Sequence, residues 1–340
     1  MSHEITSTDG LVLANNEEAW HGLGTVVSHA PTLEEAFKLA GLDWTVEQHP
    51  LNAVETTEEG KRVVYPVGTH VLNIRSDTKE QLGVVGSKYE IIQNDELMQF
   101  IEDVFKVSKT EIFVETAGSI RGGKRTWALV RLGQFNVRGT EDEIATYALF
   151  TNGHDGLQGF IVTPTGIRVV CKNTMNAALS DSRIVKLKHT RNVKERVVIA
   201  QECLGVALDN IDKLETSINT LAGSNVTVSD VQGFFLKVYQ TYYSPIVTNP
   251  TTKSEQRAHT RAINTIAKWS TNMDDDKQRI KGIEGTTWAA VNAVTQWADH
   301  ERTVRVNDNR SEAESRVESN LYGSSAKFKR HVFETGLSIC

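Results

Sequence analysis

The sequence predicts an α+β fold, with an antiparallel β-meander and packed helices in the first half and a mainly helical second half. Up to about residue 172, apolar residues recur with period two between turn residues, whereas further along they recur with the helical period. The 340 residues are also enough for two domains. We therefore expect an arm and helix over 1–43, a β-rich domain over 44–172 and a helical region over 173–340. The helical region forms either a second domain or a cover on the sheet.

The first half begins with a polar arm and a short helix, for which Thr32 is the expected N-cap, Glu35 the capping-box partner and Gly41 the end. Alternating apolar and polar residues over 44–85 predict the β-meander. Helical spacing over 95–105 predicts a helix packed on that sheet. Further strands are expected at 112–116, 126–131, 145–151 and 159–163, with a turn at Gly122-Gly123 between the first two.

The second half reads as a series of helices. A short helix is expected from Thr174 to Leu179, and a long one over 193–222 that stops at Gly223. Three more are expected at 228–243, 254–270 and 286–302. The large aromatic residues of these and the preceding elements occupy periodic positions, so we expect most of them in the core: Trp127, Phe234, Phe235, Trp288 and Trp297.

The composition excludes several classes of protein. Hydrophobic residues make up 39% and charged residues 24%, which is ordinary for a globular chain. No apolar run approaches the roughly 20 residues of a membrane span, and the first residues do not resemble a signal peptide. The three cysteines, Cys171, Cys203 and Cys340, form no C-x-x-C pair. The sequence thus predicts a cytoplasmic protein in a reducing compartment, with no membrane partner.

The charge is unevenly distributed along the chain. The formal net charge is −6, which argues against indiscriminate binding of nucleic acid. However, the segment 118–138 has five basic residues and no acidic one, and the segment 166–196 has eight basic residues against two acidic ones. Such segments either attract a polyanion to one face or are simply the solvated faces of hairpins and helices.

No Walker loop, dinucleotide fingerprint, nucleophile elbow or H-E-x-x-H motif is present. The segment 118–125 combines glycines with Arg and Lys, as a phosphate-cradling loop does, but a hairpin turn needs the same residues. The residue types of acid–base or metal chemistry occur at spacings that match no metal signature, so we predict neither a metal nor a cofactor. The candidate catalytic residues are His154, Asp155, Cys171 and His189, with Asp299-His300 a further pair of such residues.

Several short motifs, in order along most of the chain, resemble the phage/plasmid-like family of domains of unknown function. They are Trp20 to Gly24, Ser87 to Tyr89 with Gln93-Asn94, Gly118 to Trp127, Asn152 to Gly156, Arg168 to Thr174, Lys188 to Thr190, and Thr287 to Thr295 with Asp299-His300. One departure is Gly153, where the pattern has Ser or Asn before the histidine. The resemblance implies a setting in phages, prophages and plasmids, in a bacterial host cell, and no established activity.

The expected topology is also similar, without any matching motif, to that of single-strand annealing recombinases. Together with the basic segments, it favours a homo-oligomeric protein of a mobile element that binds or anneals single-stranded DNA in recombination or replication. Tyr89, expected in a turn, could stack on a base. The expected nucleic-acid-binding residues are Arg121, Lys124, Arg125, Arg168, Lys172, Lys186, Lys188, Arg191 and Tyr89.

Two other functions remain open at this point. An enzyme could gather a polar centre from strand ends, and we expect its residues to share one neighbourhood: His154, Asp155, Arg168, Cys171, Asn173 and His189. Cys171 itself, in an apolar strand, is expected to be a buried small residue rather than a nucleophile. Alternatively, the chain is a structural phage protein or a host-defence antagonist that acts by binding a protein partner.

Overall fold

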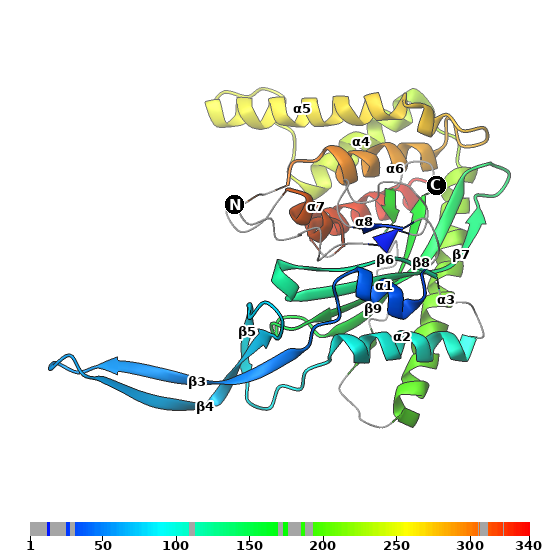
Figure 1. Cartoon of the computed structure of the whole chain (residues 1–340). Helices are drawn as coiled ribbons and strands as arrows, with labels where there is room; N and C mark the ends of the chain where they lie inside the picture. The colour runs from blue at the N-terminus through cyan, green and yellow to red at the C-terminus, as the bar shows by residue number, and fades with distance from the viewer. Residues whose placement is uncertain are drawn as a thin grey trace.

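A computed structural model gives the structure of the chain. It describes residues 12–13, 25–27, 31–108, 113–168, 173–175, 185–187, 193–304, 306, 312–321 and 323–340. Antiparallel sheets dominate the first half and helices the second, so the predicted α+β class is confirmed. Figure 1 shows the helices α4, α5, α6 and α8 gathered at one end of the molecule, with a long β-hairpin projecting from the other.

The smaller sheet is the predicted meander, with strand order β3 (Val46–Thr56), β4 (Arg62–Arg75) and β5 (Gln81–Gly86). The pairing of β5 covers only the stretch of β4 from His70 to Ile74. The outer parts of β3 and β4 therefore continue as a two-stranded ribbon, which the sequence did not predict at this length.

The larger sheet has the strand order β10-β9-β8-β7-β6, and β11 also pairs with β9. Its central strands are long and antiparallel, and consecutive buried residues in β7 and β8 show that both faces of the sheet are covered there. The strands are β6 (Phe113–Ile120), β7 (Arg125–Asn136), β8 (Glu143–Gly153), β9 (Phe160–Arg168), β10 (Asn173–Met175) and β11 (Val185–Leu187). A separate short pair, β1 (Val12–Leu13) and β2 (Thr25–Val26), is parallel.

Helices α1 (Leu33–Leu39) and α2 (Asn94–Ser108) form as expected, but α2 packs on the larger sheet rather than on the meander, as α1 also does. The Thr32 side chain accepts a hydrogen bond from the backbone N–H of Glu35 at 3.2 Å, which confirms the expected cap. Phe100 of α2 meets Phe160 of β9 edge-on, with ring centroids 5.0 Å apart. This contact belongs to one hydrophobic core formed by α1, α2 and the strands β6 to β9.

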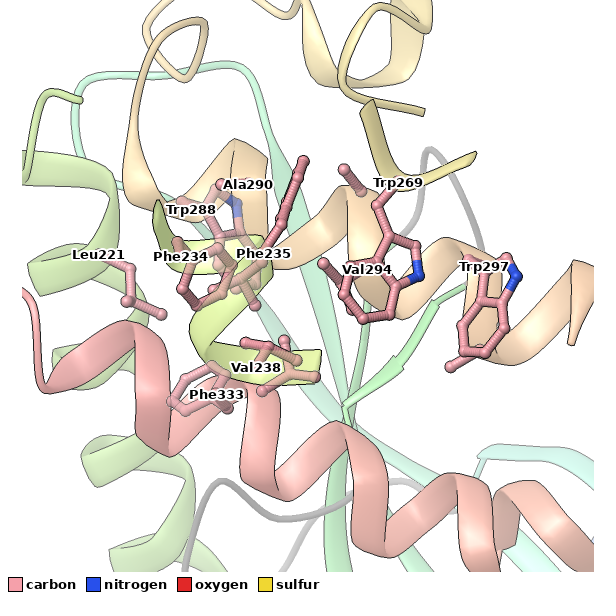
Figure 2. Close-up of a cluster of buried hydrophobic side chains, with 14 of the residues drawn as sticks. Leu221, Phe234, Phe235, Val238, Trp269, Trp288, Ala290, Val294, Trp297 and Phe333 are labelled. Atoms are coloured by element: carbon pink, nitrogen blue, oxygen red, sulfur yellow. The ribbon is translucent and has the colours of Figure 1, made fainter. Parts of the chain in front are cut away.

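The second half consists of helices around a second hydrophobic core (Figure 2). Trp269 lies at its centre, against Phe235 at 5.8 Å and Trp297 at 5.7 Å between ring centroids. Ile144 of β8 and Val137, which directly follows β7, join this core, so the helical half covers an end of the larger sheet. The helices are α3 (Val193–Gly223), α4 (Val228–Tyr242), α5 (Lys253–Met273), α6 (Thr287–Gln296), α7 (Glu312–Leu321) and α8 (Ser324–Leu337).

Four elements differ from the prediction. The segment expected as a helix from Thr174 is at its start the strand β10, because Asn173–Met175 pairs with the edge of β9. The helix expected over 286–302 is α6 followed by a π-helical turn, Trp297–Glu301. Helices α7 and α8 were not predicted. Each of the aromatic residues expected in the core is buried.

Within the described part of the chain, no helix has both the length and the apolar composition needed to cross a membrane.

Candidate nucleic-acid interface

The turn that follows β8 contains two of the candidate catalytic residues, and the first of them is inaccessible. His154 is 1% exposed, its ring lies edge-on to Trp44 at 5.3 Å, and its Nε2 is 3.2 Å from Oδ1 of Asn94. Burial lowers the pKa of His154 to about 4, although the nearby Asp155 carboxylate opposes this shift. The imidazole is therefore neutral at physiological pH and serves as a packing residue.

Asp155 is neutralised by Arg125. The Arg125 guanidinium donates a short, charge-assisted hydrogen bond to Asp155 Oδ1, and both side chains are largely buried. The same guanidinium donates to the backbone carbonyl of Lys124 at 3.1 Å. The expectation that Arg125 binds phosphate is therefore corrected, because its charge is already paired inside the protein.

Tyr89 also has a structural partner. Its hydroxyl donates to the backbone carbonyl of Gly153 at 2.9 Å, the side chain is half-buried, and burial raises its pKa. The sequence suggested a base-stacking residue exposed by a turn, and this is corrected. Asn73 reaches the same turn, since its Nδ2 donates to the His154 carbonyl at 2.8 Å. Together these contacts fix the smaller sheet to the larger one.

The basic hairpin turn between β6 and β7 is a tight turn rather than a phosphate cradle. Arg121, Gly122 and Gly123 have φ of +56°, +65° and +97°, respectively. A Cβ at Gly122 would lie 2.8 Å from the Glu80 carboxyl group, and one at Gly123 would lie 2.8 Å from the Trp44 ring. The space over the two glycines is thus filled by a carboxylate and an indole, which leaves no room for an anion.

The expected polar centre is not assembled. Arg168 pairs in register with Ile144 at the start of β8, and Asn173 pairs with Arg168, whereas His154 follows the other end of β8. Nine strand residues, or about 30 Å, separate these ends. Lys186 lies on β11, beside Ile161 of β9. Lys172, Lys188, Arg191 and the candidates Cys171 and His189 lie outside the described residues.

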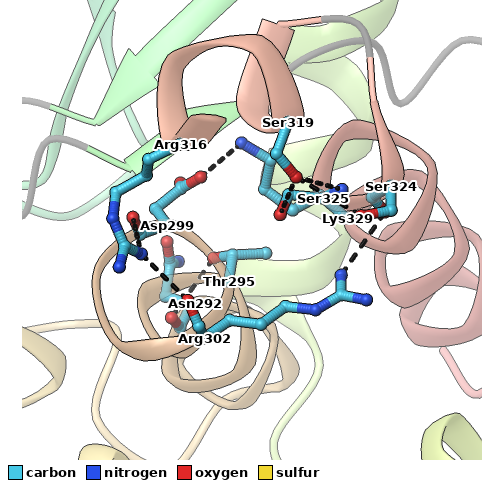
Figure 3. Close-up of polar contacts among 9 residues, drawn as sticks. All are labelled: Asn292, Thr295, Asp299, Arg302, Arg316, Ser319, Ser324, Ser325 and Lys329. Carbon is cyan, nitrogen blue, oxygen red and sulfur yellow. Dashed lines mark hydrogen bonds and ion pairs between the residues drawn. The ribbon is translucent and has the colours of Figure 1, made fainter. Parts of the chain in front are cut away.

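A buried charge network occupies the helical half (Figure 3). Lys329 Nζ donates to Asp299 Oδ1 at 2.5 Å, and each side chain is 2% exposed. Arg316 donates to the backbone carbonyls of Asp299 and Arg302 at 3.3 and 3.1 Å. Desolvation lowers the pKa of Lys329, while the Asp299 carboxylate opposes this shift. The charges satisfy each other within the core, so removal of either partner would leave the other buried and unpaired.

Helix α5 presents the clearest accessible basic surface. The helix begins with a capping box in which Thr252 Oγ1 accepts from the Glu255 N–H at 3.1 Å. Its side chains are mostly exposed, and its buried contacts are made by Ala262, Trp269 and Asn272. The helix therefore rests on the core along a narrow line and shows most of its surface to solvent.

Four cations follow one exposed face of α5. Lys253, Arg257, Arg261 and Lys268 recur at the spacing that places side chains on one side of a helix, over a length of about 22 Å. Lys268 lies 3.7 Å from Glu301, whereas the other three make no ion pair with any described carboxylate. Lys253, Arg257 and Arg261 are thus available to an external anion.

A groove with a volume of about 670 Å³ lies beside this face. One wall consists of the four cations together with amide and hydroxyl side chains of α5. The other wall is formed by Trp297, Glu301 and Thr303, from the π-helical turn and the residues after it. The groove therefore combines positive charge, hydrogen-bonding groups and the edge of an indole.

Comparison with known proteins gives a family but no activity. The family described as Domain of unknown function (DUF932) matches residues 81–321, which is more than half of the chain. The chain belongs to the DUF932 family. No curated protein and no solved structure matches it. The DUF932 match begins at the first residue of β5 and ends at the last residue of α7.

The DUF932 region thus includes α5 and its groove, whereas β3 and β4 precede it. Sequence reasoning missed the α5 surface because it searched for basic residues that are dense along the chain. The signal that could have revealed it is the four-residue spacing of Lys253, Arg257 and Arg261, from the residue before the helix predicted over 254–270 into that helix.

Proposed function

We propose that the protein binds single-stranded nucleic acid through the exposed face of α5 and the groove beside it. The observation that carries this proposal is the row of four cations on one helix face, three of them without an ion-pair partner among the described residues. Phosphates contact such cations with release of counterions, which supplies most of the affinity in sequence-independent binding.

The shape of this surface favours a single strand over a duplex. A row of charges along one helix follows one phosphate backbone, and the adjacent groove offers Gln256 and Asn264 as hydrogen-bonding groups for unpaired bases. Trp297, which is mostly buried, contributes an apolar wall there. The net charge of −6 confines contact to this face, so we expect weak to moderate affinity and little sequence preference.

The resemblance to phage and plasmid proteins supports a role for this binding in recombination or replication of a mobile element, in the cytoplasm of its bacterial host. The DUF932 family itself has no described activity, so the function rests on the α5 surface.

The test replaces the three unpaired cations together, as Lys253→Ala, Arg257→Ala and Arg261→Ala. Fluorescence anisotropy with a labelled single-stranded oligonucleotide at low salt measures binding. The matched control is Lys38→Ala, Lys281→Ala and Lys327→Ala, which removes three exposed lysines elsewhere. We expect the α5 variant to lose most of its affinity and the control to bind like the wild type. Equal loss in both variants would contradict a defined interface.

A further inference from the structure

The outer part of the β3–β4 ribbon is an arm that projects away from the other described elements. Beyond the bulge at Pro50/Leu51, six residue pairs continue from Leu51↔Val67 to Thr56↔Arg62, while β5 ends its pairing at His70. Figure 1 shows the arm projecting away from the body with no element beside it. A two-stranded ribbon in water is at best marginally stable, so this arm is built for contact with something else.

The arm is apolar on both faces. Val54 is 60% exposed, Val64 58% and Tyr65 49%. The register places Ala53 and Tyr65 on one face together with Leu51 and Val67, and it places the Val54–Val64 pair on the opposite face. Strands with apolar residues on both faces are typical of buried sheets, and exposed groups of such residues mark interaction surfaces.

The edges of the arm are poorly suited to the addition of another strand. Pro66 in the β4 edge of the arm and Pro50, directly before the arm in β3, lack the backbone N–H that a neighbouring strand would need. A partner therefore contacts the faces and the tip of the arm rather than its edges.

The tip of the arm is complementary in charge to the α5 groove. Glu58 and Glu59 are exposed in its turn, Glu55 lies one pair before the end of β3, and Lys61 precedes Arg62, the first residue of β4. The three carboxylates outnumber the two cations at the tip, whereas four cations outnumber one carboxylate in the groove, so the two surfaces have net charges of opposite sign. We propose that the arm of one copy of the protein seats its tip in the α5 groove of a second copy.

The arm cannot reach its own groove. Figure 1 places the arm and α5 at opposite ends of the molecule, so the contact requires a second copy. Ile263, 47% exposed on α5, lies one helical turn from Thr260 in the groove wall and offers an apolar contact for the arm. Two copies that exchange arms reciprocally form a closed dimer, whereas one-way contacts form a chain or ring.

The assembly and the proposed function share the α5 cations, but the assembly does not depend on nucleic acid. A nucleic acid that enters the groove competes with the arm for the same charges. Assembly in the absence of nucleic acid therefore keeps the groove occupied until a strand displaces the arm, and the two activities are mutually exclusive at each groove.

The experiment measures the oligomeric state of the full chain by sedimentation velocity at low salt without nucleic acid. One variant reverses the tip charge (Glu58→Lys, Glu59→Lys), and another reverses the groove charge (Arg257→Glu, Arg261→Glu). Each alone should raise the dissociation constant of the assembly about tenfold or more, because like charges now meet. An equimolar mixture of the two variants should assemble again, because each tip then has a complementary groove. The control is Glu90→Lys with Glu284→Lys, two exposed carboxylates outside the arm.

The outcomes separate this proposal from the proposed function. The proposed arm contact is contradicted if the wild-type chain stays monomeric at low salt. It is also contradicted if reversal of the tip charge leaves the dissociation constant of the assembly unchanged. The tip variant should still bind an oligonucleotide as the wild type does, or more tightly. If charge reversal and mixing change the assembly as expected while no oligonucleotide binds, the arm contact is supported and the proposed nucleic-acid binding is contradicted. An oligonucleotide that dissociates the wild-type assembly supports both.

Discussion

Acidification should destabilise the protein through His154, the one buried histidine among the described residues. The folded state holds its imidazole neutral, with a pKa of about 4, whereas the unfolded chain takes up the proton near pH 6.5. The folded pKa lies below the unfolded one, so this contribution to stability is complete above pH 6.5. It is lost as the pH falls from 6.5 to 4. The difference of about 2.5 pKa units corresponds to a loss of about 3 kcal/mol in the free energy of unfolding.

Urea unfolding at a series of pH values, followed by tryptophan fluorescence, measures this loss. The matched variant is His154→Gln, which cannot titrate but keeps an amide that can hydrogen-bond Asn94. Other titrating groups are common to both proteins, so the difference between the two stability curves isolates His154. We expect this difference to change by about 3 kcal/mol in favour of the variant between pH 7 and pH 4. A difference that stays constant within about 0.5 kcal/mol would refute the assignment of His154 as buried and neutral.

Two further predictions concern the helical half. Lys329→Ala should lower the free energy of unfolding by about 3–5 kcal/mol, because Asp299 is then buried without a counter-charge. In a urea titration, the double variant Lys329→Met, Asp299→Leu should lose less of the free energy of unfolding than Lys329→Ala does. Equal losses would show that lost packing, rather than an unpaired charge, causes the destabilisation. Trp269→Ala should cost about 3–5 kcal/mol in thermal or urea unfolding, since it empties the centre of the aromatic core. A loss below about 1 kcal/mol would contradict that position.

The sequence predicted those elements of the fold that depend on local patterns. Thr32 with Glu35, the alternation in the meander and the spacing of α2 to α5 are all local signals, and each appears in the structure. The strand at Asn173–Met175 is different, because its conformation depends on pairing with β9. Local propensity cannot show such a partner, which explains why a helix was expected there.

The candidate site was harder to predict, because its residues are defined by contacts that are distant in the chain. Arg125 looks like a free cation in the sequence, and only the fold brings Asp155 against it, 30 positions away. Tyr89 likewise meets Gly153 across 64 positions. The α5 cations show the opposite case, because their helical spacing is visible in the sequence but their density is low.

The salt dependence of oligonucleotide binding tests the central claim most directly. Each phosphate that a cation neutralises on a single strand contributes about −0.7 to the slope of log K against log salt concentration. Three to four engaged cations of α5 therefore predict a slope of about −2 to −3 for the wild type. Removal of Lys253, Arg257 and Arg261 should flatten the slope by about 2, while the lysine control leaves it unchanged. A wild type that does not bind at low salt, or a slope that survives the α5 substitutions, would contradict the assignment of this helix as the nucleic-acid interface.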